Sequence, residues 1–240
     1  MTGSPRGSGY EAYHAPRFAF VIGCVRVLGL PAEARILDIG PSPLTSLLRD
    51  AFPNPVDTAG LEETMPPFPG AAHYRLDLNS AGRGETGRGM PLYGLIILAE
   101  VLEHLPTAPV PVLRFLRERI EPGGWLLLQT PNAASLPKRL KLLAGRNPFD
   151  VPREDTGNPG HFREYTATEL RTIAQDAGFG VEGLFRRYYF DARYARHETG
   201  HEWPSPFAGA LKNAVYRRLP PSLREGITLV LRPRARSPEE

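Results

Sequence analysis

Hydrophobic and polar positions along the chain alternate between short apolar runs and longer stretches with helical periodicity. The short runs predict seven strands, at 35–39, 55–59, 72–76, 94–99, 124–130, 181–190 and 226–232. The fourth and fifth runs are continuously apolar, which is expected of central strands covered on both faces. Strands that alternate with helices predict an α/β fold with a doubly wound, mostly parallel, seven-stranded sheet and helices on both faces.

Three helical stretches are marked by their ends as well as by their periodicity. Residues 10–30 carry an apolar pattern that predicts a first helix. A second helix is expected to begin at Pro109, because proline suits the first turn, and to stop at Pro122. A third begins with a capping box formed by Thr166 and Glu169.

Residues 131–164 form an unusually long connection that is rich in Pro, Gly, Asn and Asp. Part of it, 135–144, is expected to form a short helix. A long loop beyond the carboxyl end of a central strand is typical of a lid or a substrate loop. We therefore expect 131–164 to contact an acceptor molecule.

The C-terminal quarter carries the positive charge of the chain. Residues 181–240 hold 11 basic and 7 acidic residues, whereas the whole chain has a net charge of +3. A helix followed by a Pro-Pro break precedes the last strand, and Leu211 and Val215 lie on its apolar face beside Lys212, Arg217 and Arg218. Contact with a membrane surface is one interpretation. Packing of this face against the sheet is preferred.

Composition limits the remaining classes. With 240 residues and 41% hydrophobic content, the chain can bury the core of one large domain. Cys24 is the single cysteine, which rules out an internal disulfide and a cysteine-rich zinc site and suits a reducing compartment. No signal peptide is recognised at the start, and no apolar run approaches the roughly 20 residues of a membrane span. A cytoplasmic location is expected.

Small or polar residues follow five of the predicted strands. In an open parallel sheet, ligands bind outside the carboxyl ends of the strands. The residues at these ends are 38–42, 59–63, 76–79, 99–106 and 129–132. They are expected to meet along one edge of the sheet, and this edge is therefore the candidate site.

The ordered set of motifs "ILDIG", "YRLDLN", "IILAEVLEHL", "LRERIEPGGWLLLQTPN" and "HFREYTATELRTIAQDAGF" resembles the class I S-adenosylmethionine-dependent methyltransferases. Within them it looks most like the bacterial subgroup related to the ubiquinone-biosynthesis O-methyltransferases. The resemblance covers about residues 30–180 and implies a Rossmann-like methyltransferase fold, with S-adenosyl-L-methionine as cofactor and S-adenosylhomocysteine as product. It also implies that 1–30 cover the cofactor site, that 31–240 form the methyltransferase domain, and that 181–240 complete the sheet.

The resemblance implies a role for each residue of the cofactor site. Glycine at position 40 allows close approach of the backbone to the cofactor. Asp38 would order the loop or bind the ammonium end of the cofactor, Arg17 would lie near its carboxylate, and Glu62, with Glu63 as a rival, would bind the ribose hydroxyls. The remaining expected cofactor-binding residues are Pro41, Ser42, Asp77 at the adenine amino group, Leu78 as an apolar wall, Glu100 and Val101.

The turn after the first strand departs from the family pattern. Pro41, Ser42, Pro43 and Leu44 stand where further glycines are usual. The prolines stiffen the turn, and Ser42 can cap the following helix together with Thr45. The missing glycines therefore bear on how tightly the cofactor binds.

Glu100, Glu103 and His104 fall at helical spacing after the fourth strand and would share one side of a helical turn. One interpretation is that they line the pocket. A second makes His104 a general base, for which the usual histidine pKa of about 6.5 is suitable. A third follows from a similar "ExxEH" in small-RNA terminal 2′-O-methyltransferases, where a distant histidine, here His161, helps to hold a divalent ion. We assign His104, Glu100 and His161 as catalytic and assign no metal.

The predicted function is S-adenosylmethionine-dependent methyl transfer to oxygen on a small natural product, a sugar or a glycan intermediate. One alternative is a metal-dependent RNA-terminal 2′-O-methyltransferase, which the lack of basic character in 1–180 disfavours. Another is a catalytically inactive module that keeps the cofactor. A nicotinamide dehydrogenase is disfavoured because G-x-G-x-x-G is absent after the first strand. No nucleic-acid partner is expected, and a homodimer is left open.

Overall fold

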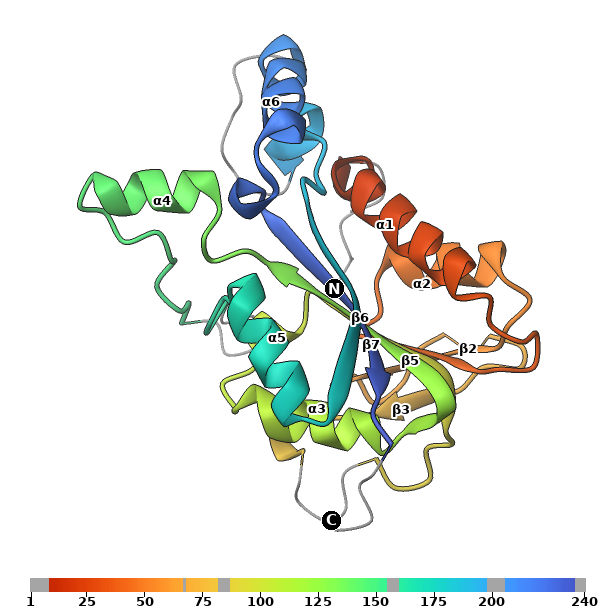
Figure 1. Ribbon diagram of the computed structural model, residues 1–240. Helices are drawn as coiled ribbons and strands as arrows, with labels where there is room; N and C mark the ends of the chain where they lie inside the picture. Colours follow the sequence, from red (N-terminus) through yellow and green to blue (C-terminus); the bar gives the residue numbers. More distant parts are fainter. Residues whose placement is uncertain (1–8, 67, 82–86, 155–159, 198–205, 236–240) are drawn as a thin grey trace.

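The computed structural model describes residues 9–66, 68–81, 87–154, 160–197 and 206–235 (Figure 1). The strands of this part form one seven-stranded sheet in the order β3-β2-β1-β4-β5-β7-β6, and β7 runs antiparallel to both its neighbours. The strands are β1 (Ile36–Ile39), β2 (Val56–Gly60), β3 (His73–Arg75), β4 (Tyr93–Ala99), β5 (Ile120–Pro131), β6 (Phe179–Arg187) and β7 (Gly226–Pro233). The predicted fold class and strand number are confirmed.

Helices cover both faces of the sheet. The α-helices are α1 (Gly9–Leu28), α2 (Pro43–Ala51), α3 (Pro109–Arg117), α4 (Leu136–Leu143), α5 (Ala167–Asp176) and α6 (Pro206–Arg218). Short 3-10 turns are η1 (Leu78–Ser80), η2 (Leu102–His104), η3 (Ala192–His197) and η4 (Pro221–Leu223). Apolar side chains of α1 and α2 pack on one face, and those of α3 and α5 pack on the other.

The apolar run at 95–98 of β4 is continuous because its side chains enter these two cores in turn. In β4, Leu95 and Ile97 join the core beneath α1, whereas Ile96 and Leu98 join the core beneath α3. Successive side chains of a strand point to opposite faces, so a strand covered on both sides needs apolar residues at every position. This burial fixes β1, β4 and β5 at the centre, with their carboxyl ends at one edge.

The predicted end of the helix that begins at Pro109 is wrong. The helix α3 ends at Arg117, and Pro122 lies inside β5. The amide of Tyr93 donates to the carbonyl of Arg119, so the chain joins the sheet before the proline is reached. A register shift between β4 and β5 accommodates the irregular residues, and Gly123 has a positive φ of 84° there.

The preferred packing of the C-terminal helix is also wrong. Leu211 and Val215 of α6 are exposed, whereas Asn213 is buried. The side chain of Asn213 accepts from the amide of Ala192 and donates to the carboxylate of Asp191. These polar contacts hold α6 against η3, since a buried backbone amide requires an acceptor. The apolar face of α6 therefore points away from the core.

The capping box of α5 is confirmed and gives a first prediction. The Thr166 side chain accepts from the amide of Glu169, and the Glu169 carboxylate accepts from the amide of Thr166. Replacing Thr166 with alanine should lower the free energy of unfolding by about 1 kcal/mol, because an N-cap hydrogen bond is lost. Thermal melting of this variant should show a lower midpoint than that of Thr172→Ala, which lies on the exposed surface of the same helix. Equal midpoints would contradict the capping role.

Candidate functional site

The turn between β1 and α2 is held by a buried carboxyl group. Asp38 accepts a hydrogen bond of 2.6 Å from the hydroxyl of Thr45. Ser42 caps α2, and Ser42 and Thr45 form the expected reciprocal capping box. Burial raises the pKa of Asp38 to about 7, although the Thr45 hydrogen bond and the charge of Arg17 oppose the rise. Asp38 therefore orders this turn, as the sequence predicted for one of its two roles.

Gly40 brings this turn against the loop that follows β4. Its φ is 77°, and a Cβ atom at this position would lie 2.8 Å from Cγ2 of Val101. A side chain at position 40 would therefore be strained in its backbone and would clash with Val101. The structure thus places the predicted cofactor turn directly beside the segment that carries Glu103 and His104.

Arg17 of α1 lies close enough to this edge of the sheet for its charge to act on two of the carboxyl groups there. The side chain is only 4% exposed, and its charge lowers the pKa values of both Asp38 and Glu103 against the effect of their burial. Among the described residues, its Nε atom has no hydrogen-bond partner. Its predicted contact with the carboxylate of the cofactor stays a prediction.

Glu62 and Glu63 point in different directions after β2. The Glu62 carboxylate lies over Gly60, within contact distance of the position that a Cβ atom would take there, and Pro41 borders the same position. The Glu63 carboxylate lies 3.8 Å from the guanidinium of Arg75 on the exposed surface. Of the two candidates for the ribose hydroxyls, Glu62 is the one that faces the β1–α2 turn.

The segment after β3 has a structural role in this conformation. The Asp77 carboxylate accepts from the backbone and the side chain of Asn79 and so caps η1. Leu78 is buried and belongs to the core beneath α3. Asp77 itself is exposed at the edge of the sheet, and its predicted contact with the adenine amino group stays a prediction.

Glu100 has a strained backbone. Its φ is 57°, and among the described residues it is the only one other than glycine with a positive φ. Its amide donates to the carbonyl of Gln129 at the end of β5. Such strain costs of order 1–3 kcal/mol and is concentrated at functional sites. The strained residue lies where the central strands β4 and β5 end, at the centre of the candidate site.

The helical turn expected after Ala99 is a 3-10 turn, η2, and it contains only two of the three residues predicted to share one side, Glu103 and His104. Glu103 is fully buried, and one of its carboxylate oxygens accepts from the hydroxyl of Thr130 at 2.9 Å. Its other oxygen has no hydrogen-bond partner among the described residues. Burial raises the pKa of Glu103 well above its usual value, and the charge of Glu100 adds to this effect.

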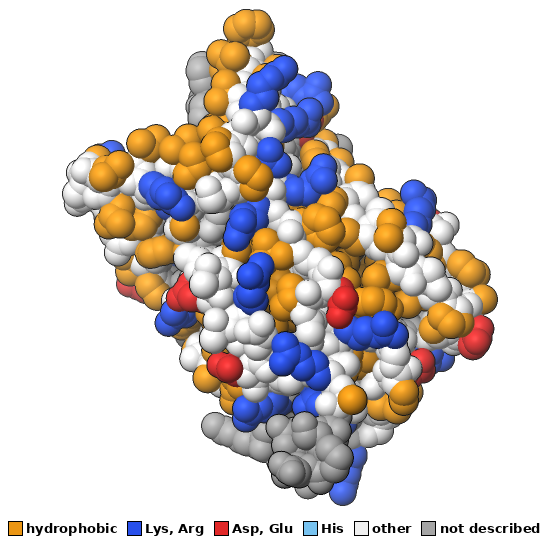
Figure 2. All heavy atoms as spheres, viewed as in Figure 1, with side chains coloured by type: hydrophobic (Ala, Val, Ile, Leu, Met, Phe, Trp, Pro, Cys, Tyr) orange, Lys and Arg blue, Asp and Glu red, His pale blue; other side chains and the backbone are white. Residues whose placement is uncertain are grey.

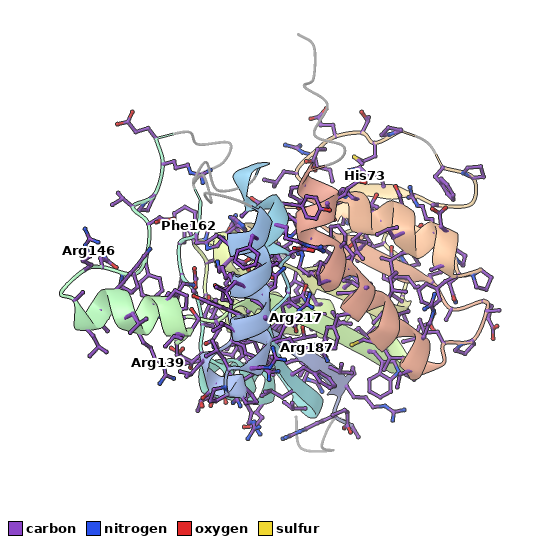
Figure 3. All side chains as sticks on the ribbon, turned by 90° about the horizontal axis from the view of Figure 1, so that it is seen from above. His73, Arg139, Arg146, Phe162, Arg187 and Arg217 are labelled. Atoms are coloured by element: carbon purple, nitrogen blue, oxygen red, sulfur yellow. The ribbon has the colours of Figure 1, made fainter. Side chains whose placement is uncertain are left out.

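Two histidines complete a cluster with Glu103. One ligand-type atom from each of Glu103, His104 and His161 lies within 4.8 Å of the others, and Glu100 is not part of this group. The imidazole rings of His104 and His161 meet edge to face at 4.7 Å between centroids. The amide of Phe162, which is labelled in Figure 3, donates to the carbonyl of Glu103 and so ties the two segments together.

Hydrogen bonds fix the proton positions of both rings. The Nδ1 atom of His104 lies 2.9 Å from the carbonyl oxygen of Gly160, which can only accept. Nδ1 therefore carries the proton, and Nε2 of neutral His104 offers a lone pair. The Nδ1 atom of His161 lies 3.1 Å from the Glu164 carboxylate. Burial and the nearby charges of His104 and Lys138 lower the pKa of His161 to about 4, so this ring is neutral near pH 7.

Sequence reasoning missed the residues that support the cluster. Thr130 bonds to Glu103, and Lys138 of α4 forms an ion pair with Glu164. Thr130 lies in the segment 129–132 at the predicted end of the fifth strand, so its position was a usable signal. Nothing in the spacing of Lys138 and Glu164 indicates their contact, because they meet across the long 131–164 connection.

A separate groove of about 1200 Å³ lies between α1 and α2. Its lining includes Ser42 and Pro43 at the start of α2 and Arg26 on α1. Its lining does not include Glu103, His104 or His161.

The model of a family described as a methyltransferase domain matches residues 14–183. This match spans more than half of the chain and contains the β1–α2 turn and the histidine cluster. The chain belongs to the methyltransferase domain family. No curated protein matches this methyltransferase.

Solved structures with the same fold have low sequence identity to this methyltransferase. An S-adenosylmethionine-dependent methyltransferase from Mesorhizobium loti is 15% identical, with a TM-score of 0.55 over 88% of this chain and 96% of its own. Magnesium protoporphyrin IX methyltransferase from Synechocystis, with bound SAH, is 14% identical, with a TM-score of 0.53 over 91% and 82%. The 4 + 2 cyclase SpnF is 16% identical, with a TM-score of 0.57 over 98% and 86%. These likenesses show the fold alone.

Proposed function

We propose that this methyltransferase moves the methyl group of S-adenosylmethionine to an oxygen atom of a small natural product, a sugar or a glycan intermediate. The observation that carries the proposal is the contact between Gly40 and Val101. This contact brings the β1–α2 turn against Val101, the residue before η2, and η2 carries His104. The resemblance of the motifs to the ubiquinone-biosynthesis O-methyltransferases supports oxygen as the acceptor atom.

The transfer needs little covalent chemistry from the protein. S-adenosylmethionine is the methyl donor, and its positive sulfur activates the methyl group. The acceptor oxygen forms the new O–CH3 bond as the S–CH3 bond breaks, and S-adenosylhomocysteine leaves. Nε2 of His104 takes the proton of the acceptor hydroxyl, while Gly160 holds Nδ1 and orients the ring. The protein contributes mainly by aligning the two reactants.

Cofactor binding is tested by calorimetry with S-adenosylhomocysteine. Heat of binding is expected for the native chain, and its absence at high protein concentration would sink the proposal. Glu62→Gln should weaken binding about tenfold, because the charged acceptor for the ribose hydroxyls is lost. Glu63→Gln is the matched control and should bind like the native chain, since Glu63 pairs with Arg75 on the exposed surface.

A second candidate mechanism uses a divalent ion at the same cluster. It is favoured by the spacing of Glu103, His104 and His161 and by the unpartnered buried oxygen of Glu103. Each ring donates Nδ1–H to an oxygen, which is the usual arrangement behind a metal-ligating histidine. An ion held here would bind the acceptor oxygen and promote loss of its proton.

Chelation separates the two mechanisms. With His104 as general base, methyl transfer should be unchanged by an excess of EDTA. With a bound ion, activity should fall with EDTA and return when Mn²⁺ is added. His161→Ala gives a second readout for the two mechanisms. If an ion is bound, loss of this ligand should remove the recovery of activity by Mn²⁺. If His104 is the general base, the variant still contains this base and should keep its activity.

A further inference from the structure

Two helices project from the end of the molecule that carries the carboxyl edge of the central strands (Figure 1). The helix α4 follows the end of β5, and α6 leads through η4 into the start of β7. These two strand ends are neighbours, because Pro131 of β5 pairs with Gly226 of β7. Both projections therefore stand at the edge that contains the candidate site.

Both projections expose apolar side chains. On α6, Phe207, Leu211 and Val215 recur every four residues along one side, and Phe207 is 79% exposed. On α4, Leu143 is 84% exposed. The exposed apolar residues of the α4 projection are Leu140, Leu142, Leu143, Phe149 and Val151. Groups of exposed apolar residues mark interaction sites, whereas single ones are ordinary.

The charged residues of both projections are mainly basic. Residues 132–151 contain four basic residues and one acidic residue, Asp150, whereas residues 207–224 contain four basic residues and no acidic one. No ion pair with a described carboxylate is formed by Arg139, Lys141, Arg146, Arg217 or Arg218. Figure 2 shows orange and blue side chains over both helices, with the red ones mainly on the body below. Figure 3 shows Arg139 and Arg146 on the α4 projection and Arg217 on α6.

We propose that the α4 and α6 projections dock on the surface of an anionic lipid bilayer. Apolar side chains flanked by Lys and Arg are the composition of helices that lie in a membrane interface. Each basic residue near such a surface is attracted by the anionic head groups. A second copy of this chain fits poorly, because like-charged projections would face each other. A small ligand also fits poorly, since the apolar side chains stand on projections and not in a hollow.

Docking would bring the candidate site to the bilayer. Lys138 of α4 pairs with Glu164, which in turn contacts His161 of the cluster. The acceptor would then be an amphiphile whose polar head reaches this cluster from the lipid surface. This consequence for the acceptor rests on the proposed function, but the docking itself does not.

Co-sedimentation of the full chain with vesicles tests the docking. At low ionic strength, binding is expected to phosphatidylcholine vesicles containing about one third phosphatidylglycerol, with much weaker binding to phosphatidylcholine alone. The pairs Phe207→Ser with Leu211→Ser, Leu142→Ser with Leu143→Ser, and Arg217→Glu with Arg218→Glu should each lower the partition coefficient about tenfold or more.

Matched controls are exposed residues on the body. Val27→Ser on α1 and Arg171→Glu on α5 should bind vesicles like the native chain. No binding of the native chain to anionic vesicles, or binding that all three pairs leave unchanged, overturns the proposal. Self-association that the pairs abolish without any vesicle binding overturns it in favour of a second copy. S-adenosylhomocysteine calorimetry on the same samples keeps failure of docking distinct from failure of the proposed methyl transfer.

Discussion

Replacing His104 with asparagine should lower the rate of methyl transfer by a factor of about 10² to 10⁴, which is the usual contribution of a general base. The asparagine amide can still donate to the carbonyl of Gly160, which His104 contacts at 2.9 Å. It has no counterpart of Nε2, so the acceptor hydroxyl loses the group that takes its proton. The measurement is single-turnover methyl transfer with saturating S-adenosylmethionine.

The affinity for S-adenosylhomocysteine distinguishes loss of the base from damage to the site. His104→Asn should bind S-adenosylhomocysteine like the native chain, because the hydrogen bond to the carbonyl of Gly160 that holds residue 104 is kept and the predicted cofactor-binding residues are unchanged. Added imidazole should restore part of the lost activity in His104→Ala. A rate within twofold of the native value for His104→Asn would remove His104 from the chemistry. An equal loss in His161→Ala, together with sensitivity to EDTA, would instead favour the bound ion.

The strands of the sheet could be predicted from the sequence because a strand buried on both faces needs a continuous run of apolar residues. Continuous apolar runs such as 94–99 indicated the central strands, and β4 is observed at Tyr93–Ala99. The capping of α2 by Ser42 and of α5 by Thr166 could be predicted for a similar reason. These caps depend on residues three positions apart, and such short-range contacts are visible in a sequence.

The arrangement after β4 could not be predicted from spacing. Helical offsets suggested that Glu100, Glu103 and His104 share one side, but residues 102–104 form a 3-10 turn and Glu100 has a positive φ. The partner of Glu103 is Thr130, which is 27 residues away and comes from the neighbouring central strand. Contacts between strand ends depend on the register of the sheet, which a single sequence does not contain.

The orientation of α6 also depends on a contact between residues far apart in the sequence, and so it could not be predicted from spacing. An apolar stripe at helical spacing predicted packing on the sheet, and this rule fails when a polar contact holds the opposite side. Asn213 and Asp191 supply that contact, and they lie 22 residues apart. The choice between Glu62 and Glu63 was likewise open, because adjacent loop residues differ only in the direction that tertiary contacts give them.

Gly40→Ala should weaken S-adenosylhomocysteine binding about tenfold or more and lower the free energy of unfolding by about 1–2 kcal/mol, the usual cost of a left-handed conformation with a side chain. Its Cβ would approach Cγ2 of Val101 to 2.8 Å, so the turn must also move away from η2. Calorimetry and thermal melting measure the two effects separately.

Gly29→Ala is the control for the cost of placing a side chain on a residue with a positive φ, which Gly40→Ala shares. Gly29 has a φ of 61°, but a Cβ there meets nothing within 4 Å. This variant should lose a similar free energy of unfolding and keep its affinity for S-adenosylhomocysteine. Val101→Ala removes Cγ2, the atom that the new Cβ would approach. In the Val101→Ala background, Gly40→Ala should therefore weaken S-adenosylhomocysteine binding less than it does in the native chain, since the two changes are coupled through one contact. If Gly40→Ala binds S-adenosylhomocysteine like the native chain, the β1–α2 turn is not the cofactor turn, because moving a turn that contacts the ligand should lower the affinity.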